Sequence, residues 1–158
     1  MAKCLRSGAT RRCCCSRSNR GARSGNDRSR RLAMILDTNA ISALLSGNGG
    51  LETVLDEESV HHLPVIAIGE YRYGLARSKY GQRLERLLDL LIQESVVLPI
   101  DESTTRHYAR LREQLRRAGT PIPENDVWIA ALAQQHDLPI ISRDSHFDTV
   151  DPRIRRAW

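Results

Sequence analysis

From residue 32 onward, short apolar runs alternate with segments that have the residue spacing of helices. The runs fall at 32–36, 60–63, 96–100 and 138–142, and their length of four or five residues is typical of buried strands. Strands that alternate with helices favour a parallel sheet with helices on both faces. We therefore expect an α/β fold with a central parallel sheet flanked by helices.

Periodicity and capping residues predict the helices between these strands. The clearest helix repeats apolar residues along one face, at Leu84, Leu87, Leu88, Leu91 and Ile92. Gly119 can end another helix, because glycine readily adopts the left-handed conformation found at helix C-termini. The remaining expected helices are short ones over 40–45 and 51–57, one that follows Pro64, one that begins at Asp101 or Ser103, and one that begins at Glu124 or Asn125.

The first 33 residues differ from the rest of the chain in composition. They hold ten of the 24 Lys and Arg residues, one of the 19 Asp and Glu residues and all four cysteines, so the body carries 14 basic and 18 acidic residues. A segment rich in Arg, Ser and Gly cannot bury a core, and this one lacks the hydrophobic stretch of a signal peptide or membrane anchor. We expect residues 1–33 to be a disordered leader and residues 34–158 to form one domain.

Met34 begins the first apolar run directly after this leader. We expect the native product to start near Met34, with the leader as an upstream mis-start or an accessory tail. An alternative is that the Arg-rich leader binds RNA through phosphate charge. Intact-mass measurement of the natively expressed protein tests this expectation, and a species that retains residues 1–33 would contradict a start near Met34.

Four acidic residues stand where a strand should end or a helix should begin. They are Asp37 after the first strand, Glu70 in the helix after Pro64, Asp126 in the first turn of its helix, and Asp144 after the last strand. Sites in parallel sheets form beyond the carboxyl ends of the strands, so the four carboxylates can converge. Carboxylates about 4 to 6 Å apart need a cation to offset their repulsion, and such hard ligands favour Mg²⁺ or Mn²⁺.

Each acid taken alone also has a structural explanation. Asp37 and Asp126 can cap helices, which stabilises a helix by about 0.5 to 2 kcal/mol. Asp144 can form a turn, and Glu70 can be a solvated helix residue. The set of four favours a metal site over these separate explanations.

The four acids also indicate a type of chemistry. Two divalent cations about 3.5 to 4 Å apart can stabilise both the attacking and the leaving oxygen of a phosphodiester displacement. The sequence has no glycine-rich phosphate loop, no Ser-His-Asp spacing and no cysteine nucleophile in the body that would favour a covalent mechanism. The carboxylates therefore indicate hydrolysis by metal-activated water.

A short motif surrounds each of the four acids. The motifs are Met34-Ile35-Leu36-Asp37-Thr38-Asn39, Ile68-Gly69-Glu70 with Tyr73-Gly74, Asn125-Asp126-Val127-Trp128-Ile129-Ala130-Ala131, and Ile141-Ser142-Arg143-Asp144 with His146-Phe147. In order and spacing they resemble the PIN-domain ribonucleases and, within them, the VapC toxins of bacterial toxin–antitoxin pairs. The resemblance covers nearly all of residues 34–158 and leaves the leader unmatched.

The resemblance implies a PIN-like three-layer sandwich and an endonuclease that cleaves RNA with Mg²⁺ or Mn²⁺ and water. It also implies a cytoplasmic toxin that forms a homodimer and is held inactive by a cognate VapB-type antitoxin. The implied catalytic and metal-binding residues are Asp37, Glu70, Asp126 and Asp144, with Asn39 and Ser142 in support and Asp148 as a competitor for the role of Asp144.

An acidic site needs nearby cations to attract a polyanion such as RNA. Arg72, Arg77 and Arg143 are candidates for phosphate contacts, although each can equally be a solvated surface arginine. Trp128 lies in the middle of a predicted helix, which favours core or dimer packing over base stacking.

Two other classes of function remain open. One is a catalytically silent PIN-like module that binds RNA or a protein partner, which need not bind Mg²⁺ in the low millimolar range. The other is a phosphohydrolase with Asp37 as the nucleophile, which requires a second Asp two residues later, where this chain has Asn39.

Overall fold

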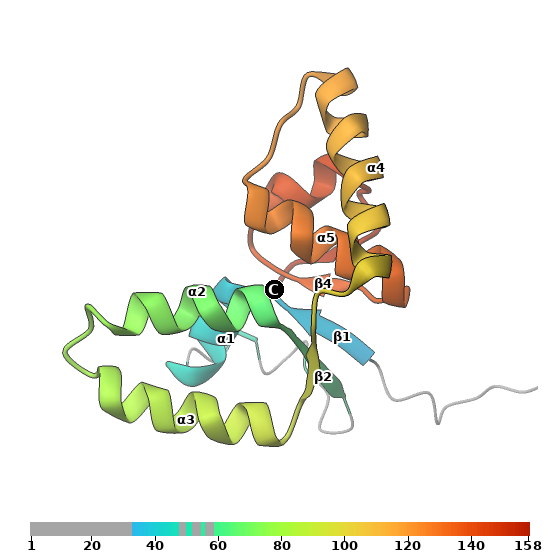
Figure 1. The fold of residues 1–158 in the computed structure, drawn as a ribbon. Helices are drawn as coiled ribbons and strands as arrows, with labels where there is room; N and C mark the ends of the chain where they lie inside the picture. The colour runs from blue at the N-terminus through green and yellow to red at the C-terminus, as the bar shows by residue number, and fades with distance from the viewer. Residues whose placement is uncertain (1–32, 48–49, 52–54, 56–58) are drawn as a thin grey trace, which may run out of the picture.

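A parallel sheet forms the centre of this computed structural model, which describes residues 33–47, 50–51, 55 and 59–158 (Figure 1). The strand order is β3-β2-β1-β4-β5, and each neighbouring pair is parallel. The strands are β1 (Ala33–Leu36), β2 (Val60–Pro64), β3 (Val96–Leu98), β4 (Ile140–Ile141) and β5 (Arg155–Arg156). The expected α/β fold with a central parallel sheet is confirmed.

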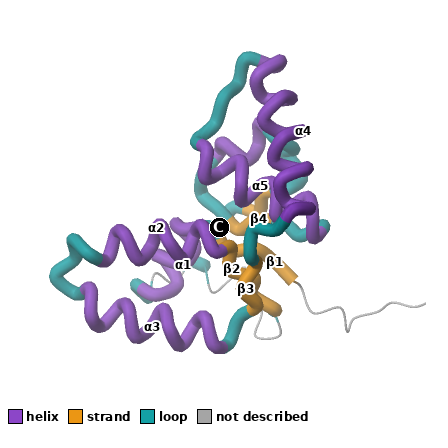
Figure 2. Tube along the Cα trace, in the orientation of Figure 1, coloured by secondary structure: helices purple, strands orange, loops and turns teal. Residues whose placement is uncertain are grey.

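The helices form two groups on opposite sides of the strands (Figure 2). Helices α1, α2 and α3 pack against one another, and α4 packs along α5. The chain moves from β1 to β3 toward one edge and then returns across the sheet to β4, so right-handed crossovers place the two groups on opposite faces. The elements are α1 (Thr38–Leu45), α2 (Val65–Leu75), α3 (Gly81–Gln93), α4 (Glu102–Ala118), α5 (Glu124–His136) and the 3₁₀ helix η1 (Ser145–Thr149). This is the expected three-layer sandwich.

The order of strands reverses between β1 and β4, and this reversal creates the crevice in which sites form in open α/β sheets. Leu36 at the end of β1 pairs with Ile141 at the end of β4. The Asp37 backbone N–H donates to the Ile141 carbonyl at 3.2 Å. Asp37 and Ser142 therefore leave the sheet side by side.

Strand β1 and helix α5 contribute many of the buried apolar residues of the core. Met34, Ile35 and Leu36 are fully buried, and α5 buries a continuous run from Ile129 to Ala133. Burial of apolar residues on several sides of a helix indicates that it packs in the core. No helix within the described residues is long and apolar enough to cross a membrane. The first turn of α5, which carries Asp126, is therefore anchored by core packing.

Trp128 of α5 stacks on Tyr108 of α4, with ring centroids 3.9 Å apart and an angle of 16° between the rings. Offset or parallel ring contacts of this kind contribute about 0.5 to 1.5 kcal/mol beyond buried area. Trp128 is partly buried and packs within the fold through this contact, which joins α5 to α4.

The structure differs from the sequence-based expectation in three places. The predicted strands over 96–100 and 138–142 are shorter, because the chain turns away after Leu98 and after Ile141. Strand β5 was not expected, since two arginines have no strand pattern and become extended by pairing with Ile140 and Ile141. The predicted helix over 51–57 lies largely outside the described residues, and so does the leader apart from Ala33.

Gly119 is expected to be a conformationally restricted position, because it ends α4 with a φ angle of 69°. Gly119→Ala should lower the free energy of unfolding by about 1 to 2 kcal/mol, since a β-carbon disfavours the left-handed region. Gly74→Ala in α2 is the control, because open space surrounds that position and alanine favours a helix by about 1 kcal/mol. Urea denaturation measures both, and an unchanged stability for Gly119→Ala would contradict this assignment.

Candidate metal centre

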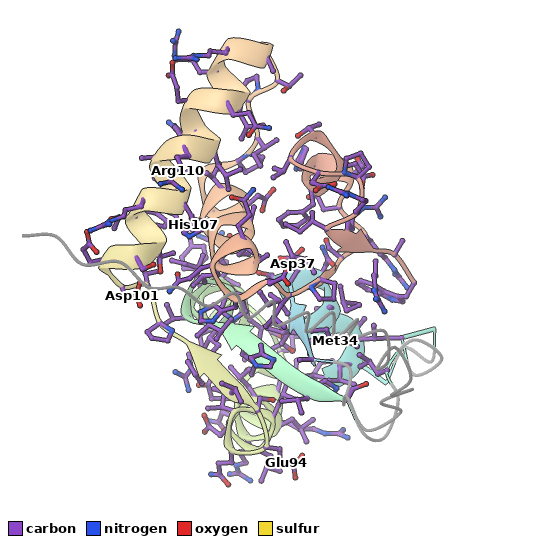
Figure 3. The ribbon with its side chains drawn as sticks, turned by 90° about the vertical axis from the view of Figure 1, so that its right-hand side faces the viewer. Met34, Asp37, Glu94, Asp101, His107 and Arg110 are labelled. Carbon is purple, nitrogen blue, oxygen red and sulfur yellow. The ribbon has the colours of Figure 1, made fainter. Side chains whose placement is uncertain are left out.

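Asp37 lies where β1 ends and α1 begins, close to the middle of the molecule (Figure 3). The residue is 4% exposed. One carboxylate oxygen accepts a hydrogen bond from the Thr38 backbone N–H at 2.6 Å. The other accepts the Ser142 hydroxyl at 2.8 Å and the Asn39 side-chain amide at 2.6 Å. These bonds fix the orientation of the carboxylate as well as capping α1.

Ser142 and Asn39 join the ends of the two central strands. The Asn39 amide also donates to the Ser142 hydroxyl oxygen at 3.0 Å, and its carbonyl oxygen accepts the Arg143 backbone N–H at 3.2 Å. The Asp144 backbone N–H donates to the same hydroxyl oxygen at 2.9 Å. The two polar residues therefore orient Asp37 and the loop that carries Asp144.

Glu70 connects three helices through its two carboxylate oxygens. One oxygen accepts the Thr38 hydroxyl of α1 at 2.6 Å, and the other accepts the Asn125 side-chain amide of α5 at 2.6 Å. Both donors come from residues adjacent to an acid of the predicted set. The contacts bring the acidic side chain of α2 to the same edge of the sheet as Asp37 and Asp126.

Asp126, Asp144 and His146 form a compact cluster at this edge. Each offers one ligand atom, and the three atoms lie within 4.8 Å of one another. The His146 Nδ1 atom lies 2.9 Å from an oxygen of Asp144 and 3.1 Å from an oxygen of Asp126. The imidazole therefore bridges the two carboxylates.

The four predicted acids line one cavity of about 1080 Å³. Burial is the main cause that raises the pKa of Asp126 to about 6, and the negative charges of Asp37 and Asp144 also raise it, whereas the His146 hydrogen bond lowers it. Burial likewise raises the pKa of Asp37, in opposition to its hydrogen bonds with Ser142 and Thr38. The cavity therefore disfavours the ionised forms of Asp37 and Asp126 when no cation is bound.

The donor set fits a divalent cation. Four carboxylates converge, and none of the described residues that line the cavity is a lysine or arginine. Oxygen ligands with this charge suit Mg²⁺ or Mn²⁺. A cation in the cavity would offset the repulsion that raises the pKa of Asp37 and Asp126.

Asp148, considered in the sequence as a competitor for the role of Asp144, forms an ion pair with Arg155. Its two oxygens accept hydrogen bonds from Arg155 at 2.7 and 2.6 Å, and this pair lowers the pKa of Asp148. Arg155 also donates to the Ser142 carbonyl at 3.3 Å. Asp148 is not among the residues that line the cavity, whereas Asp144 is. The pair of Asp148 and Arg155 therefore supports the loop around Asp144.

The three arginines considered for RNA contacts lie outside the cavity lining. Arg72 forms ion pairs with Glu85 at 2.8 Å and Asp89 at 2.9 Å on α3. Arg143 lies over the Trp158 ring, 4.8 Å from its centroid. Arg77 lies over the Tyr73 ring beside the cavity. Of these three guanidinium groups, that of Arg77 lies against a ring that lines the cavity, whereas Arg143 reaches the lining residue Asn39 through its backbone N–H.

Sequence reasoning assigned no role to His146 or Arg155. The spacing of Asp144 and His146, two residues apart after a strand, is the signal that could have identified the histidine as a metal-site candidate. Arg155 had no such signal, because its partner Asp148 is recognised only through the turn of η1 and the pairing of β5 with β4.

A family model for the PIN domain matches residues 34–152, a range that contains all four acids. The chain belongs to the PIN domain family. This match confirms the family that the four motifs indicated.

Similar proteins of known name and structure agree with this assignment. The PIN domain is 34% identical over 121 residues to Ribonuclease VapC5 of Mycobacterium tuberculosis, which covers 75% of this chain and 88% of that relative. VapBC-1 from nontypeable Haemophilus influenzae matches with a TM-score of 0.69 and 26% identity, covering 80% of this chain and 98% of that one. VapBC-5 from M. tuberculosis, a member of the VapBC family of toxin–antitoxin systems, matches with a TM-score of 0.63 and 27% identity, covering 80% and 97%.

The raised pKa of Asp126 predicts how the stability of the PIN domain depends on pH when EDTA removes divalent cations. The carboxyl group binds its proton more tightly in the folded state, with a pKa of about 6, than in the unfolded chain, where the ordinary value is 3.8. Its contribution to stability is complete below about pH 4 and is lost as the pH rises through 6.

Asp126→Asn should remove this loss of stability at higher pH, because asparagine does not ionise. The melting temperature of the variant relative to the parent should therefore increase between about pH 4 and pH 7, as measured by thermal unfolding in EDTA. Asp89→Asn is the control, because Asp89 lies on α3 outside the cavity, where it pairs with Arg72 of α2. Parallel pH profiles for Asp126→Asn and the parent would contradict the assignment.

Proposed function

We propose that this PIN domain is a metal-dependent endoribonuclease toxin. The observation that carries the proposal is the convergence of Asp37, Glu70, Asp126 and Asp144 on one cavity from four separate segments. The relative VapC5 is named a ribonuclease, and VapBC-5 belongs to a family of toxin–antitoxin systems. The first relationship supports cleavage of RNA rather than another phosphodiester chemistry, and the second supports a toxin role.

The four acids would hold Mg²⁺ or Mn²⁺ at the edge of the sheet. When bound, such a cation activates water and stabilises the negative charge that develops on phosphate oxygens. The chain itself supplies the orientation of its ligands. Hydrogen bonds from Ser142, Asn39 and Thr38 hold Asp37, and those from Thr38 and Asn125 hold Glu70. Ligands oriented in this way lose little freedom when the cation binds.

Partners and location complete the proposal. A cognate VapB-type antitoxin would neutralise the toxin, because VapBC-5 is described as part of a toxin–antitoxin system. A homodimer and a cytoplasmic location, where RNA is found, follow from the resemblance to VapC toxins. Size-exclusion chromatography with light scattering tests the dimer, and a monomer at micromolar concentration would contradict it.

RNA cleavage by the purified protein tests the proposed activity. The parent chain should cut RNA with Mg²⁺ or Mn²⁺ and should stop when EDTA is added. Asp37→Asn and Asp126→Asn should each lower the cleavage rate by about 100-fold or more, because each removes a charged ligand from the site. Gel analysis of end-labelled RNA measures the rate.

Two controls separate loss of chemistry from loss of fold. Asp89→Asn removes an exposed acid outside the cavity and should cleave at the parent rate. Circular dichroism should show that Asp37→Asn and Asp126→Asn retain the fold. Parent-like cutting by these two variants would contradict the proposed site, and a parent that binds Mg²⁺ without cutting would instead favour the catalytically silent module.

A further inference from the structure

The cavity that holds the four acids continues along α2, because Gly74, Leu75 and Ser78 also line it. Figure 1 shows the turn that joins α2 to α3 at this end. Glu70, Tyr73 and Gly74 all line it and are spaced three and four residues apart, so they lie on one face of the helix. Arg77 follows one turn later, just past the end of α2. A metal-binding acid, an aromatic ring and an arginine thus succeed one another along the cavity.

Tyr73 is unusually exposed for an aromatic residue, at 66%. The glycines at positions 69 and 74 flank this face of α2, and a β-carbon at either would meet nothing within 4 Å. Both positions therefore leave open space along this part of the cavity wall. Flat groups of a ligand can reach the ring without displacing side chains.

Arg77 orients the ring of Tyr73. Its guanidinium carbon lies 5.1 Å from the ring centroid, and its Nη2 donates to the Tyr73 hydroxyl at 2.9 Å. A cation over a ring covers one face and leaves the opposite face for another partner. Among the described residues, the one stacked aromatic pair is Tyr108 with Trp128, so no described ring stacks on Tyr73.

The charges around the cavity make a stacking contact important for RNA. No described lysine or arginine lines the cavity, and Arg72 and Arg143 have other partners. Apart from the proposed cation, few positive charges along this part of the cavity can therefore contact RNA phosphates. Stacking of a base on an aromatic side chain requires no positive charge and is tolerant of sequence.

We propose that Tyr73, held by Arg77, is a nucleobase-stacking subsite for an unpaired nucleotide next to the cleaved phosphate. The inference rests on the proposed function, because the subsite is continuous with the proposed metal centre. Bases are available for stacking only when they leave the helical stack, so the subsite selects single-stranded segments and loops of RNA over duplex RNA.

Binding measurements on a chain that leaves RNA intact test the subsite. The full chain with Asp37→Asn is titrated into a fluorescently labelled single-stranded RNA of about ten nucleotides, and anisotropy gives the Kd. Adding Tyr73→Ala should raise the Kd by about 5- to 150-fold, the effect of losing one base-stacking contact. Tyr73→Phe should remain close to the Asp37→Asn chain, because it keeps the ring.

Tyr80→Ala is the matched control. Tyr80 is also exposed, at 70%, and it does not line the cavity. Its substitution should leave the Kd unchanged. An equal loss for Tyr80→Ala, an unchanged Kd for Tyr73→Ala, or a Tyr73→Phe variant as weak as Tyr73→Ala would overturn the subsite.

Salt and duplex controls identify the nature of the contact. The effect of Tyr73→Ala should be the same factor at low and at physiological salt, because stacking releases no counterions, and it should vanish for duplex RNA of the same length. A loss that disappears with salt, or one that is equal for duplex RNA, would overturn the proposal. Failure of the parent chain to cleave RNA would instead contradict the proposed function and leave the binding result intact.

Discussion

The parallel pairing of β1 with β4 is the interaction on which the rest of the site depends. It sets Asp37 beside Ser142, so that the hydroxyl of one strand end orients the carboxylate of the other. The chain crosses one face of the sheet to reach β2 and the opposite face to reach β4. Helices α2 and α5 therefore approach this crevice from different sides. Glu70 and Asp126 then converge on Asp37 through the hydrogen bond between Glu70 and Asn125.

The same convergence makes the site unfavourable as long as its charges are uncompensated. Burial raises the pKa of Asp37 and raises that of Asp126 to about 6, and neighbouring carboxylates raise both pKa values further. Such groups lower the stability of a fold unless a partner offsets their charge. The fold nevertheless gathers these carboxylates in one cavity, which is the arrangement expected of a site selected for cation binding and not for stability.

The sequence predicted those parts of the structure that depend on local patterns. Residue type and spacing placed Gly119 at the end of α4 and narrowed each N-cap to two candidates, of which Asp37 caps α1 and Asp101 caps α4. The convergence of the four acids was predictable because parallel strands share one carboxyl edge. Residue roles that depend on long-range contacts could not be predicted from the sequence. Nothing local distinguishes Asp148 from Asp144 until β5 brings Arg155 to Asp148, and nothing local shows that Arg72 is paired with α3.

The central claim is that Asp37, Glu70, Asp126 and Asp144 together hold a divalent cation. A crystal structure of the chain grown with Mn²⁺, with anomalous diffraction data collected at the manganese edge, tests this claim most directly. The account predicts an anomalous peak within about 2.0 to 2.4 Å of oxygens from these carboxylates. A peak at another place on the PIN domain, or no peak at saturating Mn²⁺, would contradict it.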